Sequence, residues 1–141
     1  MFYTAKFIKI KDHSTAATSA VTSDAVDTAG YERVTFLTSF GTAAADNSVK
    51  VQQSSDDAAA DAYADLEGTS VVSGTSDEDI VVTIVKPRER YLKLVATRGT
   101  SSTLESVWAI LHGPVRSQPV DNTTSGTITG ELHVSPAEGT A

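Results

Sequence analysis

The residues best suited to acid–base chemistry are three histidines, His13, His112 and His133, which lie among many serines and aspartates. A Ser-His-Asp triad needs its members to converge in space, which spacing along the chain neither shows nor excludes. No Gly-x-Ser-x-Gly elbow marks a nucleophile. We expect His112 to lie at a strand end with its hydrogen-bonding groups satisfied. The sequence therefore predicts no catalytic residue and a protein that is not an enzyme.

Four aspartates, Asp56, Asp57, Asp61 and Asp65, are the best candidates for metal ligation, because carboxylate oxygens suit Ca²⁺. An EF-hand loop needs oxygens at alternate positions, a central glycine and a closing glutamate, and this order lacks them. The glycines form neither a Gly-x-Gly-x-x-Gly fingerprint nor a P-loop. We therefore expect solvated loop aspartates, no metal and no cofactor, with a structural cation as the alternative.

The best candidates for contact with a partner are basic residues: Lys86, Arg88 and Arg90, and farther along the chain Arg116. A guanidinium group can pair with a carboxylate through two parallel hydrogen bonds, which an ammonium group cannot do as well. We predict that these four residues bind a protein partner. The alternative is a charged hairpin turn between two strands, in which Glu89 partly neutralises its neighbours.

Charge is unevenly distributed along the chain, whose net charge is −7. Nine of the eighteen acids fall between Asp46 and Asp79, and six of the eleven bases follow them. This layout suits head-to-tail contact between copies or contact with a charged protein lattice, while ordinary solvated loop charge is the alternative. The negative total argues against nucleic acid as a partner. The chain contains no cysteine and no apolar run that approaches a membrane span.

Three predicted strands organise the chain, namely Ile80–Lys86, Tyr91–Arg98 and Ser106–His112. The first is an unbroken run of β-branched residues, which are stiff at χ1 and suit a pleated surface. Pro87 ends it, because proline has no N–H to give to a ladder. We expect these strands to form the centre of an all-β core.

Alternating residues predict further strands on either side of that centre. Tyr31–Phe40 places Val34, Phe36 and Phe40 on one face and Leu37 on the other. Ser48–Ser55 alternates most cleanly, with Val49 and Val51 inward and Lys50, Gln52 and Ser54 outward. Additional short strands are expected at Tyr3–Lys11, Val21–Val26, Ala62–Leu66 and Val71-Val72, whereas Asp12–Ala20 reads as a loop.

The predicted fold class is therefore all-β, an antiparallel β-sandwich that is jelly-roll-like and has an irregular C-terminal tail. Residues 1–119 form the sandwich domain, and residues 120–141 form a polar C-terminal extension. Within the extension, Thr127–Val134 keeps Ile128, Leu132 and Val134 at even positions, a pattern that could add a strand to a neighbouring chain. Aromatic residues make up only 6% of the chain, so oligomerisation or docking is expected to complete a thin core.

Five short motifs occur in succession: Gly30-Tyr31 with Val34-Thr35-Phe36, Val49 to Asp56, Ala62 to Gly68, Arg90-Tyr91-Leu92, and Ile110 to Pro114. Over roughly Tyr31 to Pro119 this succession resembles small structural proteins of tailed bacteriophages, which include capsid decoration (cement) proteins. The resemblance implies a homotrimer on the head exterior, assembled in the host cytoplasm. Such a homotrimer would bridge subunits of the major capsid protein and help the head to resist the internal DNA pressure. Tyr63 departs from the tryptophan found in many such sequences.

On this hypothesis three linked copies bind the lattice far more tightly than one, and the N-terminal segment, the polar tail or both supply the contacts. The negative charge and the lack of a long apolar run predict no nucleic-acid partner and no membrane partner. The alternative function is a tail- or fibre-associated module that recognises a host surface glycan. The tyrosines and Trp108 do not cluster in the sequence, so no sugar platform is predicted from them.

Overall fold

A computed structural model of the chain describes residues 2–42, 44–73, 78–114, 120–121 and 128, and in these residues every regular element is a β-strand. The strands are β1 (Phe2–Tyr3), β2 (Lys6–Lys11), β3 (Ser14–Ala17), β4 (Val21–Thr22), β5 (Val26–Asp27), β6 (Tyr31–Ser39), β7 (Ser48–Ser54), β8 (Ala64–Asp65), β9 (Val71–Val72), β10 (Asp79–Val85), β11 (Tyr91–Thr97), β12 (Ser102–Leu104), β13 (Val107–Pro114) and β14 (Val120–Asp121). All the strand pairs are antiparallel. The prediction of an all-β protein with antiparallel sheets is confirmed.

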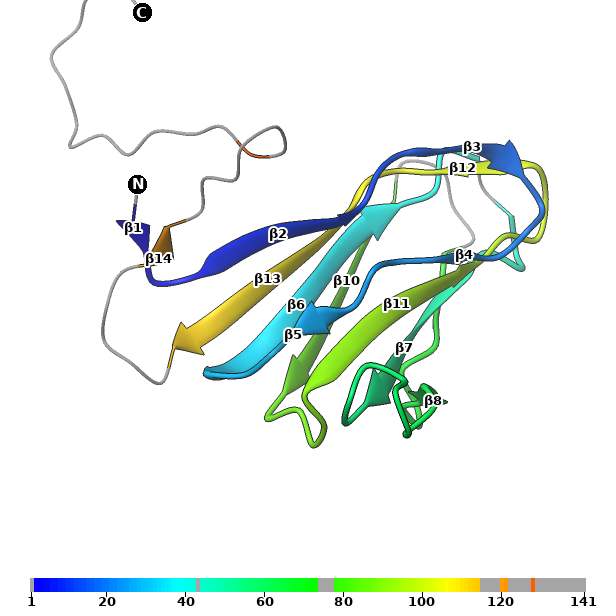
Figure 1. Cartoon of the computed structure of the whole chain (residues 1–141). Helices are drawn as coiled ribbons and strands as arrows, with labels where there is room; N and C mark the ends of the chain where they lie inside the picture. Colours follow the sequence, from blue (N-terminus) through cyan, green and yellow to red (C-terminus); the bar gives the residue numbers. More distant parts are fainter. Residues whose placement is uncertain (1, 43, 74–77, 115–119, 122–127, 129–141) are drawn as a thin grey trace, which may run out of the picture.

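Two larger sheets dominate the molecule (Figure 1). The four-stranded sheet has the order β10-β6-β13-β2. The six-stranded sheet has the order β4-β11-β7-β8, with β5 also paired to β11 and β9 also paired to β7. Two small ribbons complete the pairing, β12 with β3 and β1 with β14. The two ends of the described chain therefore meet, because Phe2 and Tyr3 lie opposite Asp121 and Val120.

One hydrophobic core joins the two larger sheets. The four-stranded sheet contributes inward residues of β6 and β13, including Val34, Phe36 and Leu111, and the six-stranded sheet contributes Val51 and Leu94. Each of these side chains is at most 2% exposed. Because successive strand residues point to opposite faces, alternate residues are buried in β11, in β6 from Val34 onward and in β7 as far as Val51.

The alternation predicted for two strands is largely confirmed. Val34, Phe36 and Phe40 are buried and Leu37 faces the other way, as expected for Tyr31–Phe40. In β7, Val49 and Val51 are buried as predicted. The outward placement of Ser54 was wrong, because its side chain is fully buried and its hydroxyl donates to the carbonyl oxygen of Asp61 at 2.7 Å.

The three strands expected at the centre do not form one sheet. β10 and β13 belong to the four-stranded sheet and β11 to the six-stranded sheet, and β10 is an edge strand. The outward valines of β10, Val81 and Val85, are 59% and 63% exposed, so the β-branched run is buried on one face only. The suggested hairpin between β10 and β11 is also wrong. The connection 86–90 instead crosses from one sheet to the other.

The loop predicted for Asp12–Ala20 contains a strand. Ser14–Ala17 forms β3 and pairs with β12, which begins before the predicted third strand. This ribbon consists mainly of small and hydroxyl-bearing residues, so its sequence does not alternate between apolar and polar residues. Ser102 and Leu104 are nevertheless fully buried. Figure 1 shows the ribbon extending beyond β2 and β13 at one end of the molecule.

Candidate functional site

The outer face of the four-stranded sheet carries an apolar surface. Cross-strand partners share a face, so the register places Val81, Leu37 and Trp108 in one row across β10, β6 and β13. A second row contains Thr83, Thr35, Ile110 and Phe7. We call these residues, together with Val85, the outer sheet face. Phe7 is 36% exposed, and Leu37, Trp108 and Ile110 are half-buried.

Basic residues lie at one end of this face. Arg33 is opposite Val85 on the outer side, and Lys86 and Arg88 follow β10. All three side chains are exposed, and none makes a hydrogen bond or ion pair with a described residue. A backbone hydrogen bond holds the start of this connection in place, because the Lys86 N–H donates to the Glu32 carbonyl oxygen at 2.7 Å. The backbone of Lys86 has a positive φ of 50°.

Arg90 behaves differently from Lys86 and Arg88. Its Nε and Nη2 donate to the two carboxylate oxygens of Asp27 at 2.9 and 2.8 Å, and its guanidinium lies 5.2 Å from the centre of the Tyr91 ring. This bidentate bond holds the pKa of Asp27 below its ordinary value. Arg90 therefore fastens β5 beside the start of β11. Of the four predicted partner-binding residues, Arg116 lies outside the described residues.

The aspartates considered for a metal are used in the local fold. Asp56 accepts the N–H groups of Ala60 and Asp61, Asp61 accepts the N–H of Ser55, and Asp57 accepts the hydroxyl of Tyr63 at 2.6 Å. Burial and that contact raise the pKa of Tyr63. Asp65 accepts Lys50 Nζ at 2.7 Å. Across the described residues, no three His, Asp or Glu side chains come together in a way that could hold a metal ion.

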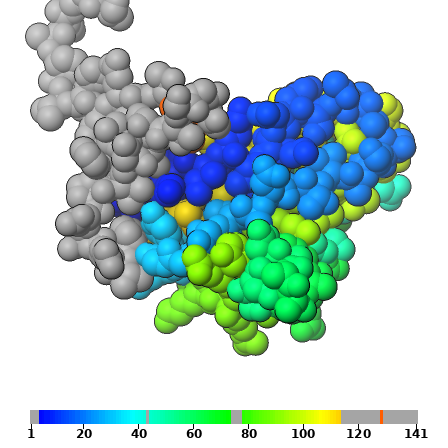
Figure 2. All heavy atoms as spheres, viewed as in Figure 1, coloured from blue at the N-terminus to red at the C-terminus, as the bar shows by residue number. Residues whose placement is uncertain are grey.

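Two carboxyl groups meet beside the basic connection. The hydrogen bonds from Ser55 hold the pKa of Asp61 below its ordinary value. Burial and the adjacent Asp61 raise the pKa of Glu89. Figure 2 shows the segment around residues 55–65 next to the connection that follows β10, at the lower side of the molecule. Acidic and basic groups thus share this end of the protein, which the separate charge blocks in the sequence did not reveal.

The two histidines that the structure describes, His13 and His112, lie at opposite ends of the β2–β13 pair and do not come together. His13 is exposed on the approach to β3, with Nδ1 3.3 Å from Glu105 Oε2. His112 is half-buried near the end of β13, opposite Arg33. His133 lies outside the described residues. His112 therefore lies near a strand end, as expected, whereas its hydrogen bonding stays a prediction.

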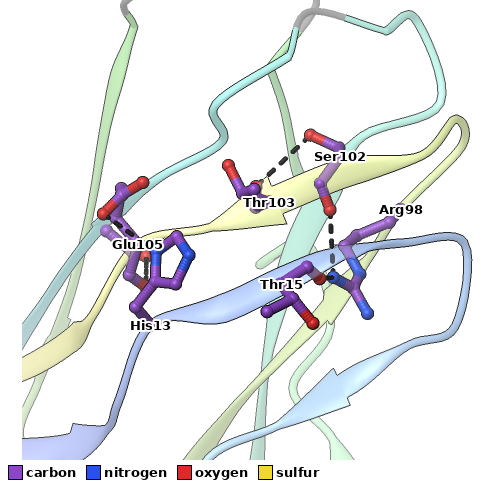
Figure 3. A network of polar contacts seen from close by, with 7 residues as sticks. His13, Thr15, Arg98, Ser102, Thr103 and Glu105 are labelled. Carbon is purple, nitrogen blue, oxygen red and sulfur yellow. Dashed lines mark hydrogen bonds and ion pairs between the residues drawn. The ribbon is translucent and has the colours of Figure 1, made fainter.

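A polar groove of about 620 Å³ lies between β3, β4 and the end of β11. Its lining includes Lys11, His13, Asp24 and several hydroxyl groups. Arg98, only 5% exposed, also lines the groove. Its guanidinium donates to the carbonyl oxygens of Thr15 and Ser102 at 2.7 and 2.9 Å (Figure 3) and to that of Ser19 at 2.8 Å. Because the buried guanidinium bonds to carbonyls and a hydroxyl, it connects the β3–β12 ribbon to β11.

Comparisons with known proteins identify no relative. No family model, curated protein or solved structure matches the chain. In the part of the chain that the structure describes, no helix is long and apolar enough to cross a membrane.

Proposed function

We propose that the protein is a virion structural protein that binds the outside of a tailed-phage head and stabilises the capsid lattice. In this proposal a homotrimer contacts subunits of the major capsid protein and performs no catalysis. The protein acts through its surface, which binds a capsid lattice in which the same binding site is repeated many times. Each copy makes modest contacts, and linked copies bind far more tightly than one.

The observation that carries the proposal is the outer sheet face. Soluble monomers rarely expose a contiguous group of large apolar side chains, and such patches mark interaction sites. Here Val81, Leu37 and Trp108 form one row, and Ile110 and Phe7 lie in the next. Val85 lies beyond that second row, opposite Arg33, and Lys9 lies opposite Trp108. Arg33, Lys86 and Arg88, which pair with no described residue, border the face and can pair with carboxylates of a partner.

We further propose that the fold is a jelly-roll sandwich. The order of strands supports this, because consecutive major strands alternate between the two sheets. β2, β6, β10 and β13 belong to one sheet, and β4, β5, β7 and β11, which lie between them in the chain, belong to the other. Jelly rolls occur in viral capsid proteins and in lectins, so the fold favours a binding role by analogy only.

Purified virions of the phage that encodes this chain provide the test. Quantitative mass spectrometry gives the copy number, and cryo-electron microscopy locates the copies. We expect many copies on the head, and Ile110→Lys should reduce head occupancy about tenfold by charging the outer sheet face. Thr22→Lys, which places the same charge on an exposed position of β4, is the control. Absence of the chain from the virion would overturn the proposal.

The polar groove favours glycan recognition as the second candidate function. Its hydroxyls, Asp24 and His13 can exchange hydrogen bonds with sugar hydroxyls, although no Phe, Tyr or Trp is among the described residues that line it. A glycan array with the purified chain tests this function. Binding that Asp24→Ala abolishes, together with no affinity for heads, would replace the capsid proposal. No binding to any glycan would remove the second candidate.

A further inference from the structure

The strand β10 has a free edge. Among the described residues it pairs only with β6, so the backbone groups on its other side have no strand partner. Between Asp79 and Lys86 the residues are Ile80, Val81, Val82, Thr83, Ile84 and Val85. All six are β-branched and strongly favour an extended strand. An edge of this kind is a template for pairing with another chain.

No protective feature interrupts this edge. Edge strands are usually guarded by lysine, proline or a bulge, and β10 has none of these within its pairing with β6, which runs without a register shift. Its outward residues lie level with the outer sheet face, and Thr83 Oγ1 is 2.9 Å from Thr35 Oγ1 on β6. Val81 and Val85 remain largely exposed.

The charged residues that directly flank β10 have opposite signs at its two ends, although Glu32 and Glu89 also lie near the basic end. Asp79 begins the strand, and Lys86 and Arg88 follow its last residue. Arg33 adds a third base at the same end, directly opposite Val85. Two copies aligned antiparallel along β10 therefore place the acid of each beside the bases of the other. Parallel alignment would instead bring like charges together.

We propose that β10 pairs antiparallel with β10 of a second copy of this chain, about a two-fold axis perpendicular to the sheet. The two four-stranded sheets then form one continuous sheet, with both outer faces on the same side. Backbone hydrogen bonds supply affinity, and the exposed valines of the two copies pack against one another. The end charges select the antiparallel direction.

This contact does not require the proposed function. It concerns two copies in solution and can be tested without phage heads, so its failure and the failure of capsid binding are separate results. In a homotrimer, the β10 pair would join a copy of one trimer to a copy of the next. Dimers or even-numbered assemblies are therefore expected, and a trimer with no larger species contradicts the inference.

Sedimentation equilibrium of the full chain over a concentration series measures the association. The double variant Val81→Lys, Val85→Lys adds the missing edge lysines, and we expect dissociation of the pair to become at least about tenfold easier. Phe7→Lys is the matched control on β2, the opposite edge of the same face, and should leave association unchanged. If Phe7→Lys weakens association equally, the copies stack face to face and the edge pairing is wrong. Circular dichroism confirms that each variant is folded.

A charge exchange tests the antiparallel direction. Asp79→Lys alone and Lys86→Glu with Arg88→Glu alone should each weaken the pair, because like charges then meet at both ends. An equal mixture of these two variants should associate as the unaltered chain does, since opposite charges meet again at both ends. Failure of the mixture to associate, or a chain that stays monomeric at every concentration, overturns the inference.

Discussion

The two edge strands of the four-stranded sheet differ in their chemistry. β2 carries Lys6, Lys9 and Lys11, and Lys9 pairs with Asp12 at 2.6 Å. β10 carries only β-branched residues between its terminal charges. Both edges belong to the same sheet and both send an isoleucine into the same core. The difference shows that one edge is protected against pairing with other chains and the other is not.

The inward isoleucines provide the largest expected effect, and they should behave alike on both edges. Ile10 on β2 and Ile80 on β10 are each 3% exposed. Ile10→Ala and Ile80→Ala should each lower the free energy of unfolding by about 2–5 kcal/mol, through lost burial and the cavity left behind. Urea denaturation measures this. If Ile80→Ala had no effect, β10 would not be anchored in the core as described.

Removing the protection from β2 should make that edge associate too. In the double variant Lys9→Val, Lys11→Val, we expect new, concentration-dependent association of at least about tenfold in the equilibrium constant, because the edge then resembles β10. Sedimentation velocity measures it. The comparison between the edges would fail if this variant associated no more than the unaltered chain.

The bond between Arg90 and Asp27, beside the connection that follows β10, should have a smaller effect that depends on pH. Because the folded pKa of Asp27 is lowered from 3.8, its stabilisation is complete above that value and is lost as pH falls through the folded pKa. The side chains are 54% and 44% exposed, so Asp27→Asn should cost about 1 kcal/mol or less at pH 7. Urea titrations at pH 7 and pH 3 should show the difference shrinking at the lower pH.

Glu89 should give the smallest effect, of opposite sign. Its pKa is raised in the folded state, so the folded protein binds this proton more tightly than the unfolded chain does. Ionisation of Glu89 therefore destabilises the fold. This destabilisation is absent below pH 4.5 and complete above the pKa of Glu89 in the folded state. Glu89→Gln should raise the melting temperature slightly at pH 7 and leave it unchanged at pH 3.5. A lower melting temperature at pH 7 would contradict this.

Alternation made much of the fold predictable from the sequence. Val34 and Phe36 in β6 and Val49 and Val51 in β7 have the period of two that a half-buried strand requires. The sheet to which each strand belongs could not be read in the same way. An unbroken run such as Ile80–Val85 suits a fully buried strand and an unprotected edge equally well, so its exposed face appeared only in the structure.

The candidate site was less predictable, because it depends on contacts between distant residues. Arg90 looked as available as Arg88, but Asp27, 63 residues earlier in the chain, binds it through both carboxylate oxygens. Trp108 was expected to be a core or sheet-edge residue, and its place on the outer sheet face follows from its register with Leu37. The lysines of β2 are a sequence feature typical of a guarded edge, and none occurs between Ile80 and Val85.

One measurement tests directly whether this protein acts through a surface of its β-sheet. Cryo-electron microscopy of purified virions, at a resolution that traces strands, would show which surfaces of the bound copies are covered. We predict many copies on the head. Each copy should have its outer sheet face or its β10 edge buried against capsid protein or a second copy. Copies that leave both surfaces open to solvent, or virions that lack the chain, would contradict it.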